Sequence, residues 1–159
     1  MPIDGTEYPL DVRLMRQSAL RLIGETAVVP GDAELDVLTL RMRGHLQLLI
    51  PEVEKAARAR PTDDIPRYCA LACVGEAGLR LNARVQAAQD ALPRARRLAR
   101  SLNALCDHYE SLTEPMTCVL CDQLIGEEEA SAPCGQVDET GSTRTSRAHR
   151  HCLARQRRR

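Results

Sequence analysis

Large aromatic side chains are almost missing from this sequence. It contains neither Phe nor Trp, and its three tyrosines are Tyr8, Tyr68 and Tyr109. Any hydrophobic core must therefore be built from aliphatic residues, Met and Cys. Because β-strands favour aromatic and β-branched side chains, this composition favours packed helices over a β-sandwich.

Signals for export and for membranes are missing as well. Residues 1–7 lack the basic start and apolar run of a signal peptide, and no stretch approaches the ~18 apolar residues that a spanning helix needs. We therefore expect a cytoplasmic protein that does not engage a membrane. In such a protein, seven cysteines are expected to be metal ligands or buried thiols rather than a disulfide framework.

Net charge is zero overall, but it is uneven in the C-terminal third. Residues 113–140 carry seven acids and no base, whereas residues 141–159 carry seven Arg and no acid. Residues 1–112 balance at fifteen of each sign. This longer segment therefore offers no general attraction for nucleic acid, and the basic C-terminal end is a local feature.

Hydrophobic periodicity predicts four helices within residues 1–112. The first spans about residues 10–24, and the second starts at a cap at Asp32 and runs to about residue 60, with Pro51 kinking or splitting it. His45 lies among the leucines of the second helix and is expected to be packed and hydrogen-bonded. The fourth helix has the clearest pattern, with apolar residues in alternating steps of four and three: Ala91, Ala95, Leu98, Leu102, Leu105, Tyr109 and Leu112.

The third helix is predicted to follow a cap at Asp63 or Asp64. Its expected buried stripe consists of Ile65, Cys69, Ala72, Cys73 and Leu79. Four amphipathic segments joined by short connections predict a mainly α protein with an antiparallel four-helix bundle over residues 1–112. Residues 113–117 then form a linker.

Residues 118–159 carry a spacing typical of a zinc module. Cys118 and Cys121 form a Cys-x2-Cys pair, and His149 and Cys152 follow three positions apart. The first pair can reach one ion from a tight turn, and the second shares a face when it opens a helix, so together they complete a tetrahedral Zn²⁺ shell. Four protein ligands predict structural zinc, because catalytic zinc keeps a position open for water.

A weak hairpin is predicted between the two ligand pairs. Residues 132–137 and 142–148 form its strands, and residues 138–141 form a turn that contains glycine. A Cys-x2-Cys turn, a hairpin and a ligand-bearing helix follow one another in a treble-clef zinc finger. The order of these parts predicts a treble-clef-like module with a basic C-terminal helix.

Several other residues compete for a role in metal binding. Cys134 and His151 are rival zinc ligands, although Cys134 is expected to be an apolar filler in the hairpin and His151 to point elsewhere on the helix. The acidic run at residues 127–129 is interpreted as a solvated loop. Cys69 and Cys73 could belong to a second metal site, but free Cys is among the most buried residue types, so core packing is favoured.

The basic tail offers a different kind of surface. Its arginines, which continue the predicted ligand helix, are Arg155, Arg157, Arg158 and Arg159. They could contact nucleic acid, but the base-stacking aromatics of single-strand binders are absent.

We find no phosphate-binding loop, nucleophile elbow or Ser/His/Asp arrangement. The leading hypothesis is a non-enzymatic regulatory or protein-interaction protein with a protein partner, and the alternative is a nucleic-acid-associated regulator.

Three stretches carry a family resemblance: LDVLTLRMRGHLQLLIPEVE (35–54), YCALACVGEA (68–77) and ARSLNALCDHYE (99–110). Over about residues 15–112 the sequence resembles an actinobacterial, largely streptomycete, family of helical proteins of unknown function, often labelled natural-product biosynthesis proteins. Some members end in a Cys-x2-Cys…His-x2-Cys segment, which supports pairing His149 with Cys152. The label implies an association with biosynthetic or regulatory loci and, as a further alternative, an accessory enzyme of secondary metabolism. It supplies no catalytic residues.

Overall fold

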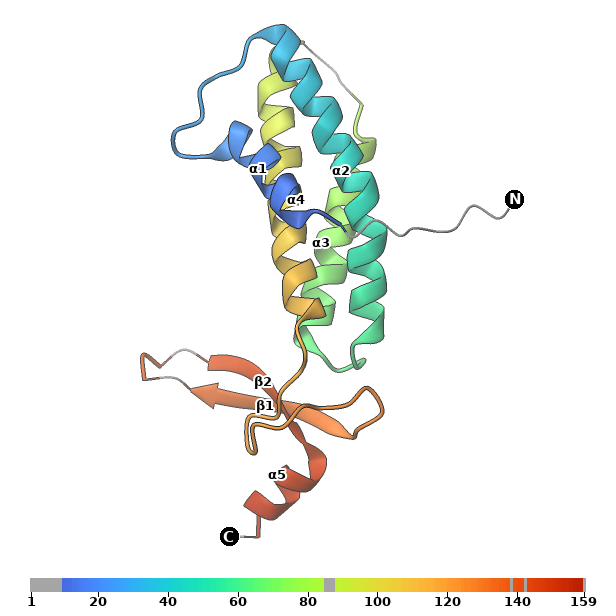
Figure 1. Cartoon of the computed structure of the whole chain (residues 1–159), viewed down its shortest axis with the longest axis vertical. Helices are drawn as coiled ribbons and strands as arrows, with labels where there is room; N and C mark the ends of the chain where they lie inside the picture. The colour runs from blue at the N-terminus through green and yellow to red at the C-terminus, as the bar shows by residue number, and fades with distance from the viewer. Residues whose placement is uncertain (1–9, 85–87, 138, 142, 159) are drawn as a thin grey trace, which may run out of the picture.

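The computed structural model describes residues 10–84, 88–137, 139–141 and 143–158. Figure 1 shows a helical part above a smaller C-terminal part, which we define as residues 10–113 and 114–158. The elements, in chain order, are α1 (Val12–Ile23), α2 (Asp32–Ala59), α3 (Ile65–Asn82), the 3-10 turn η1 (Ala88–Asp90), α4 (Ala91–Thr113), β1 (Ser131–Val137), β2 (Thr143–His149) and α5 (Arg150–Gln156). The protein is mainly helical, as predicted.

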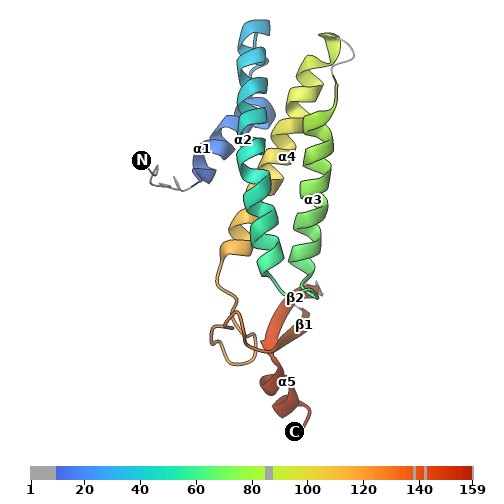
Figure 2. The ribbon, with the colours of Figure 1, turned by 90° about the vertical axis from the view of Figure 1, so that its right-hand side faces the viewer.

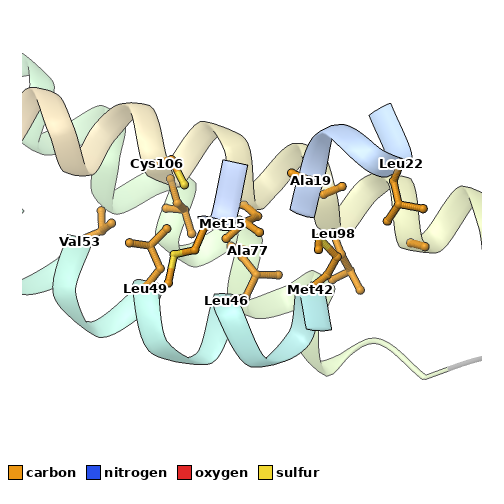
Figure 3. Close-up of a cluster of buried hydrophobic side chains, with 14 of the residues drawn as sticks. Met15, Ala19, Leu22, Met42, Leu46, Leu49, Val53, Ala77, Leu98 and Cys106 are labelled. Carbon is orange, nitrogen blue, oxygen red and sulfur yellow. The ribbon is translucent and has the colours of Figure 1, made fainter. Parts of the chain in front are cut away.

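One aliphatic core holds the helical part together. α4 packs against α1, α2 and α3, and the seam predicted for it is confirmed, because Ala95, Leu98, Leu102 and Leu105 are fully buried. Figure 3 shows side chains of all four helices meeting there, with Met42 and Leu46 of α2 among them. Each buried leucine contributes ~1.5–3 kcal/mol relative to an exposed one, so this core is the main source of stability for the helical part.

α2 departs from the prediction at its start and is unbroken at Pro51. Gly31 is the N-cap residue, so Asp32 is the first helical residue rather than the cap. The helix continues through Pro51 as a single element of 28 residues. Proline removes the amide that would bond to the carbonyl of Gln47, but Gln47 is exposed and water can serve that carbonyl.

His45 of α2 joins α1, as expected for a packed histidine. Its Nε2 lies 3.3 Å from the Oγ of Ser18, and both residues are largely buried. Burial lowers the pKa of His45, and the nearby positive charge of Arg41 lowers it further. The imidazole is therefore neutral at physiological pH and serves packing.

The buried face of α3 is not the predicted one. Ala70 and Ala77 are fully buried, whereas Ile65 and Leu79 are 47% and 76% exposed and Cys69 is exposed as well. Charged side chains are rare on α3, so apolar residues occupy both of its faces and periodicity could not decide which face meets the core. The prediction of a buried Ile65–Cys69–Leu79 stripe was wrong for this reason.

The C-terminal part is built on the predicted hairpin. β1 and β2 pair antiparallel from Ser131↔His149 to Val137↔Thr143, within one residue of the expected strands, although the predicted starting residue Ser142 lies outside the described residues. Gly141 adopts φ +81 beside the turn, a backbone conformation that favours glycine. Cys118, Ile125 and Ala148 form a small second core under this hairpin.

Figure 2 shows the C-terminal part at one end of the helical part, beyond the connection between α2 and α3. None of the helices in the described ranges is long and apolar enough to cross a membrane. The predicted division into residues 1–112, 113–117 and 118–159 stays a prediction.

Candidate metal centre

A tight turn presents the first two cysteines. The amide of Cys118 donates to the Gln123 carbonyl at 2.8 Å, and the amide of Asp122 donates to the Cys118 carbonyl at 2.8 Å. Asp122 adopts φ +57, a left-handed conformation that a non-glycine residue takes up only at some cost. This bend closes the turn, so Cys118 and Cys121 face the same point.

The hairpin brings the second pair to the same place. His149 ends β2 and is the N-cap residue of α5, and Cys152 lies in the first turn of α5. The amide of His149 donates to the Cys118 sulfur at 3.4 Å, and the amide of Val119 donates to the Arg147 carbonyl at 3.1 Å. β2 is therefore held directly against the Cys-x2-Cys turn.

The four predicted ligands form one group. One ligand atom each from Cys118, Cys121, His149 and Cys152 lies within 4.8 Å of the others. The Nδ1 of His149 is 3.5 Å from the Cys121 sulfur and 3.9 Å from the Cys152 sulfur. Metal–sulfur bonds of ~2.3 Å and metal–nitrogen bonds of ~2.0–2.1 Å place tetrahedral ligands about 3.5–3.8 Å apart, so the group could hold a metal ion.

Glu129 is a further residue of the site, and the interpretation of residues 127–129 as a solvated loop missed it. Its Oε2 lies 3.3 Å from His149 Nε2 and accepts from the Gly126 amide at 2.7 Å. Binding a metal through Nδ1 leaves the proton on Nε2, where it can donate to this carboxylate. Glu129 thereby fixes both the tautomer and the ring orientation of His149. No spacing rule for zinc ligands would have found it.

Two thiols of the group differ strongly in acidity. Although desolvation by burial would raise the pKa of Cys118, hydrogen bonds from the His149 and Leu120 amides and from the Cys121 thiol lower it to about 6. Desolvation raises the pKa of Cys152 to about 11, and its hydrogen bonds with the Cys121 and Cys118 sulfurs act in the same direction. The backbone thus prepares Cys118 as a thiolate, whereas Cys152 needs a cation beside it to lose its proton.

Neighbouring groups of the site also shift the pKa of His149. Desolvation lowers the pKa of His149, but hydrogen bonds with Cys118 and Glu129 outweigh it and the net shift is upward. The pKa of Glu129 is lowered, first by the Gly126 amide and then by His149, since both favour the carboxylate. The carboxylate therefore stays charged and available to His149.

The rival ligands lie beside the group without belonging to it. Cys134 is half-buried and packs against the small core of the C-terminal part, as its expected role of filler predicts. His151 is exposed and stacks on His149, with ring centroids 4.9 Å apart. Among the residues that the structure describes, only Cys118, Cys121, His149 and Cys152 form a group of three or more potential ligands.

The family comparison matches the helical part. DUF6415, a family of unknown function, matches residues 13–114, which is more than half of the chain. The chain belongs to DUF6415. No curated protein matches it, and no solved structure does. The match to DUF6415 ends before Cys118, so the candidate metal ligands lie outside the segment that matches the family.

The cysteines within the DUF6415 segment do not form a second site in the described residues. Cys69 is exposed, contrary to the expected core packing, whereas Cys73 is half-buried and Cys106 is fully buried. Desolvation raises the pKa of Cys106 to about 11 and also raises that of Cys73. These two are protonated packing residues at physiological pH.

Arg147 joins the C-terminal part to the helical part. Its side chain is only 7% exposed, and its Nε and Nη2 donate to the Oγ and carbonyl of Ser131 at 3.1 and 3.3 Å. Nη2 also lies 2.9 Å from Asp63 Oδ1, and Nη1 lies 3.7 Å from Asp64 Oδ1. Asp64 is buried and pairs with Arg60 at 3.0 Å.

This contact changes the role of a predicted cap. Asp64 does occupy the N-cap position of α3, but its side chain makes no capping hydrogen bond. Its carboxylate faces Arg60 and Arg147 instead, so it links the connection between α2 and α3 to β2. Because Arg147 lies two residues before His149, β2 carries both a candidate metal ligand and the side chain that contacts the helical part.

Proposed function

We propose that this chain is a non-enzymatic regulatory or protein-interaction protein whose C-terminal part is held together by structural Zn²⁺. The observation that carries the proposal is the group of donors from Cys118, Cys121, His149 and Cys152 within 4.8 Å of one another. Three thiolates and one imidazole fill a tetrahedral zinc shell, so no position remains for a catalytic water. Thiolate-rich ligand sets also favour Zn²⁺ over Mg²⁺ or Ca²⁺.

The proposed architecture is an antiparallel four-helix bundle followed by a treble-clef-like zinc module. Packing of α4 against α1, α2 and α3 around one core supports the bundle. The sequence of Cys-x2-Cys turn, β1–β2 hairpin and α5 supports the treble clef. The module's core is small, so metal binding supplies the free energy that orders it.

The proposed location is the cytoplasm. None of the seven cysteines forms a disulfide, which fits a reducing compartment. The proposed association with actinobacterial natural-product loci depends on the resemblance described above, and so does the alternative of an accessory enzyme.

In this proposal zinc also positions the C-terminal part, because one ligand and the side chain that contacts the helical part lie on the same strand, β2. His149 holds the metal and Arg147 holds Asp63 and Asp64. Loss of the ion would release both the Cys-x2-Cys turn and the end of β2. Zinc thereby fixes where α5 stands relative to the helical part.

The exposed face of α3 supports a protein partner. Ile65, Tyr68 and Leu79 are 47%, 61% and 76% exposed and lie on one face, at positions that follow steps of three and four with Ala72 and Gly75 between them. A helix that is apolar on both faces is normally covered on both. We propose that the partner covers this face with an apolar helix, because a three-four spacing matches helix-to-helix packing.

The protein partner can be tested with surface variants. Tyr68→Glu and Leu79→Glu should abolish stoichiometric co-purification of the partner, since each places a charge in the apolar face. Val28→Glu is the matched control, because Val28 is 84% exposed on the connection between α1 and α2. Light scattering on the purified chain identifies a second copy as the partner if self-association disappears in the α3 variants. Identical captured proteins for wild type and all three variants would contradict an interaction through α3.

A nucleic-acid-associated regulator is the second candidate, and a groove beside the metal ligands favours it. Arg155 and Arg158 of this groove flank Cys121 and Cys152, with Leu120 and Gln156 completing its lining. Arg157 is exposed nearby, and Arg159 lies outside the described residues. Each phosphate contact makes binding salt-dependent. Anisotropy with labelled random duplex should therefore show an affinity that falls between 50 and 200 mM salt and is lost in an Arg155→Gln, Arg158→Gln double variant. Binding that is absent at 50 mM salt excludes this candidate.

A further inference from the structure

A second feature of interest lies at the end of the helical part that is opposite the C-terminal part. There α3 ends and α4 begins, as Figure 2 shows at the end away from β1 and β2. A cavity of about 160 Å³ opens between the two helices. Its charged lining consists of Arg80, Arg84, Arg94 and Arg97 with a single acid, Asp90. Four guanidinium groups against one carboxylate give this cavity a strong local excess of positive charge.

Carboxylates neutralise several arginines elsewhere in this chain. Arg16 pairs with Asp107 and Glu110, and similar ion pairs hold Arg21, Arg58 and Arg60. Around the cavity only Arg80 has an acid partner, Glu76. No ion pair joins Arg84, Arg94 or Arg97 to any other residue in the ranges that the structure describes. Three cationic side chains therefore line one cavity without an ion-pair partner among the described residues.

Arg94 adds a second, independent observation. Its Nη2 donates to the Ala83 carbonyl at 2.8 Å, which fixes the guanidinium against the end of α3. Its Nε is buried and has no hydrogen-bond partner among the described residues. An unpaired buried N–H is costly, so a side-chain shift that brought Nε to an acceptor in the cavity would be favourable. Arg94 thus lines the cavity with one N–H that has no acceptor among the described residues.

The surrounding structure favours an anion in the same place. Arg80 is held by Ser101 Oγ at 2.8 Å and by Glu76, so its guanidinium is oriented before any ligand arrives. α4 begins at Ala91, directly after Asp90 of the cavity lining, so the positive N-terminal end of its dipole lies near the cavity. A water molecule takes up ~30 Å³ of liquid, so the cavity has room for a compact oxyanion in place of several waters.

We propose that this cavity is a binding site for a phosphate group, either free inorganic phosphate or the phosphate of a small ester. Guanidinium groups present planar pairs of donors that match phosphate oxygens, and a doubly charged phosphate offsets the excess of positive charge better than a single carboxylate. Arg94 and Arg97 contact the anion, and Arg80 supports it from α3. Asp90 repels an anion, which restricts the site to the arginine side of the cavity.

Isothermal titration calorimetry with inorganic phosphate tests the site, with potassium chloride at matched ionic strength as the salt control. We expect saturable 1:1 binding that weakens at least tenfold in Arg94→Gln and in Arg97→Gln. Arg41→Gln is the matched control, because it removes the same charge from an exposed position on α2, and its dissociation constant should stay within twofold of wild type. Glycerol 3-phosphate in a parallel titration separates the two sources: tighter binding than phosphate indicates an ester ligand, and equal binding indicates phosphate itself.

Melting curves keep the test decisive if a variant is less stable. Arg97 is exposed, so Arg97→Gln should fold even if Arg94→Gln does not. Phosphate should raise the melting temperature of wild type and Arg41→Gln but leave that of Arg97→Gln unchanged. Three results would each overturn the proposal: no heat with 10 mM phosphate, binding that chloride reproduces, or unchanged phosphate binding in Arg97→Gln.

Discussion

Replacing Arg147 with Met should detach the C-terminal part from the helical part while leaving each of them folded. Met keeps the apolar volume of the side chain and removes every polar interaction that the guanidinium makes. Those interactions are two hydrogen bonds to Ser131, the ion pair with Asp63 and the longer ion pair with Asp64. Because all of these hold β2 against β1 and against the connection between α2 and α3, the substitution weakens the joint between the two parts.

The size of the effect follows from which charges remain buried. A hydrogen bond of a charged group contributes ~1.5–3 kcal/mol, and breaking a buried ion pair costs ~3–5 kcal/mol when the remaining charge has no partner. Asp64 is buried but keeps Arg60, and Asp63 is half-exposed, so the upper values do not apply. We expect a loss of about 2–4 kcal/mol in the unfolding free energy of the zinc-loaded protein.

Thermal melts give this free energy, and hydrogen exchange locates it. Exchange in Arg147→Met should rise at residues 60–67 and 130–149 and stay unchanged along α4. Arg150→Met is the control, because Arg150 is exposed on α5 and carries the same charge. A melting temperature within one degree of wild type, with unchanged exchange at residues 60–67, would refute the claim that Arg147 holds the two parts together.

Three further predictions concern single positions. Leu102→Ala should lower the unfolding free energy by about 2–5 kcal/mol in thermal melts, because Leu102 is fully buried and a cavity remains; a change of less than ~0.5 kcal/mol would contradict its place in the core. Glu129→Gln should weaken zinc binding about 10–100-fold in chelator competition, since His149 loses its charged partner, whereas exposed Glu127→Gln should have no effect; equal effects of the two would remove Glu129 from the site. Burial raises the pKa of the Cys106 thiol above its ordinary value of 9.0 to about 11. The stability that the protonated thiol contributes is therefore complete below pH 9 and is lost as the pH rises through 11. Cys106→Val should reduce this alkaline loss of unfolding free energy by up to about 2–3 kcal/mol, and an unchanged pH profile would contradict the prediction.

The sequence predicted best where one pattern allowed only one arrangement. The alternating steps from Ala91 to Leu112 fit a single buried face of α4, and Leu98, Leu102 and Leu105 lie in the core. The spacing of Cys118 with Cys121 and of His149 with Cys152 likewise brought four donors together. In each case the spacing itself favoured one arrangement, although Cys134 and His151 were rival ligands in the second.

Prediction failed where several arrangements were equally compatible with the pattern. α3 carries apolar residues on both faces, so Ile65 and Leu79 were assigned to the core although they are exposed. The contacts of Glu129 with His149 and of Arg147 with Asp64 join residues that lie 20 or more positions apart in the sequence. Local periodicity does not predict such contacts. The cavity between α3 and α4 likewise joins residues from two helices, such as Arg80 and Arg97, which lie 17 positions apart in the sequence.

Native mass spectrometry of the freshly purified, reduced chain and four variants tests the zinc site most directly. We predict one zinc per chain for wild type, Cys134→Ser and His151→Ala, and none for Cys121→Ser and Cys152→Ser. A chelator should unfold residues ~116–157 and leave α1–α4 helical, because no ligand belongs to the helical part, so circular dichroism should keep most of its helical signal. Metal retained in Cys152→Ser but lost in Cys134→Ser or His151→Ala would contradict the ligand set, and wild-type protein without metal would contradict the zinc site itself.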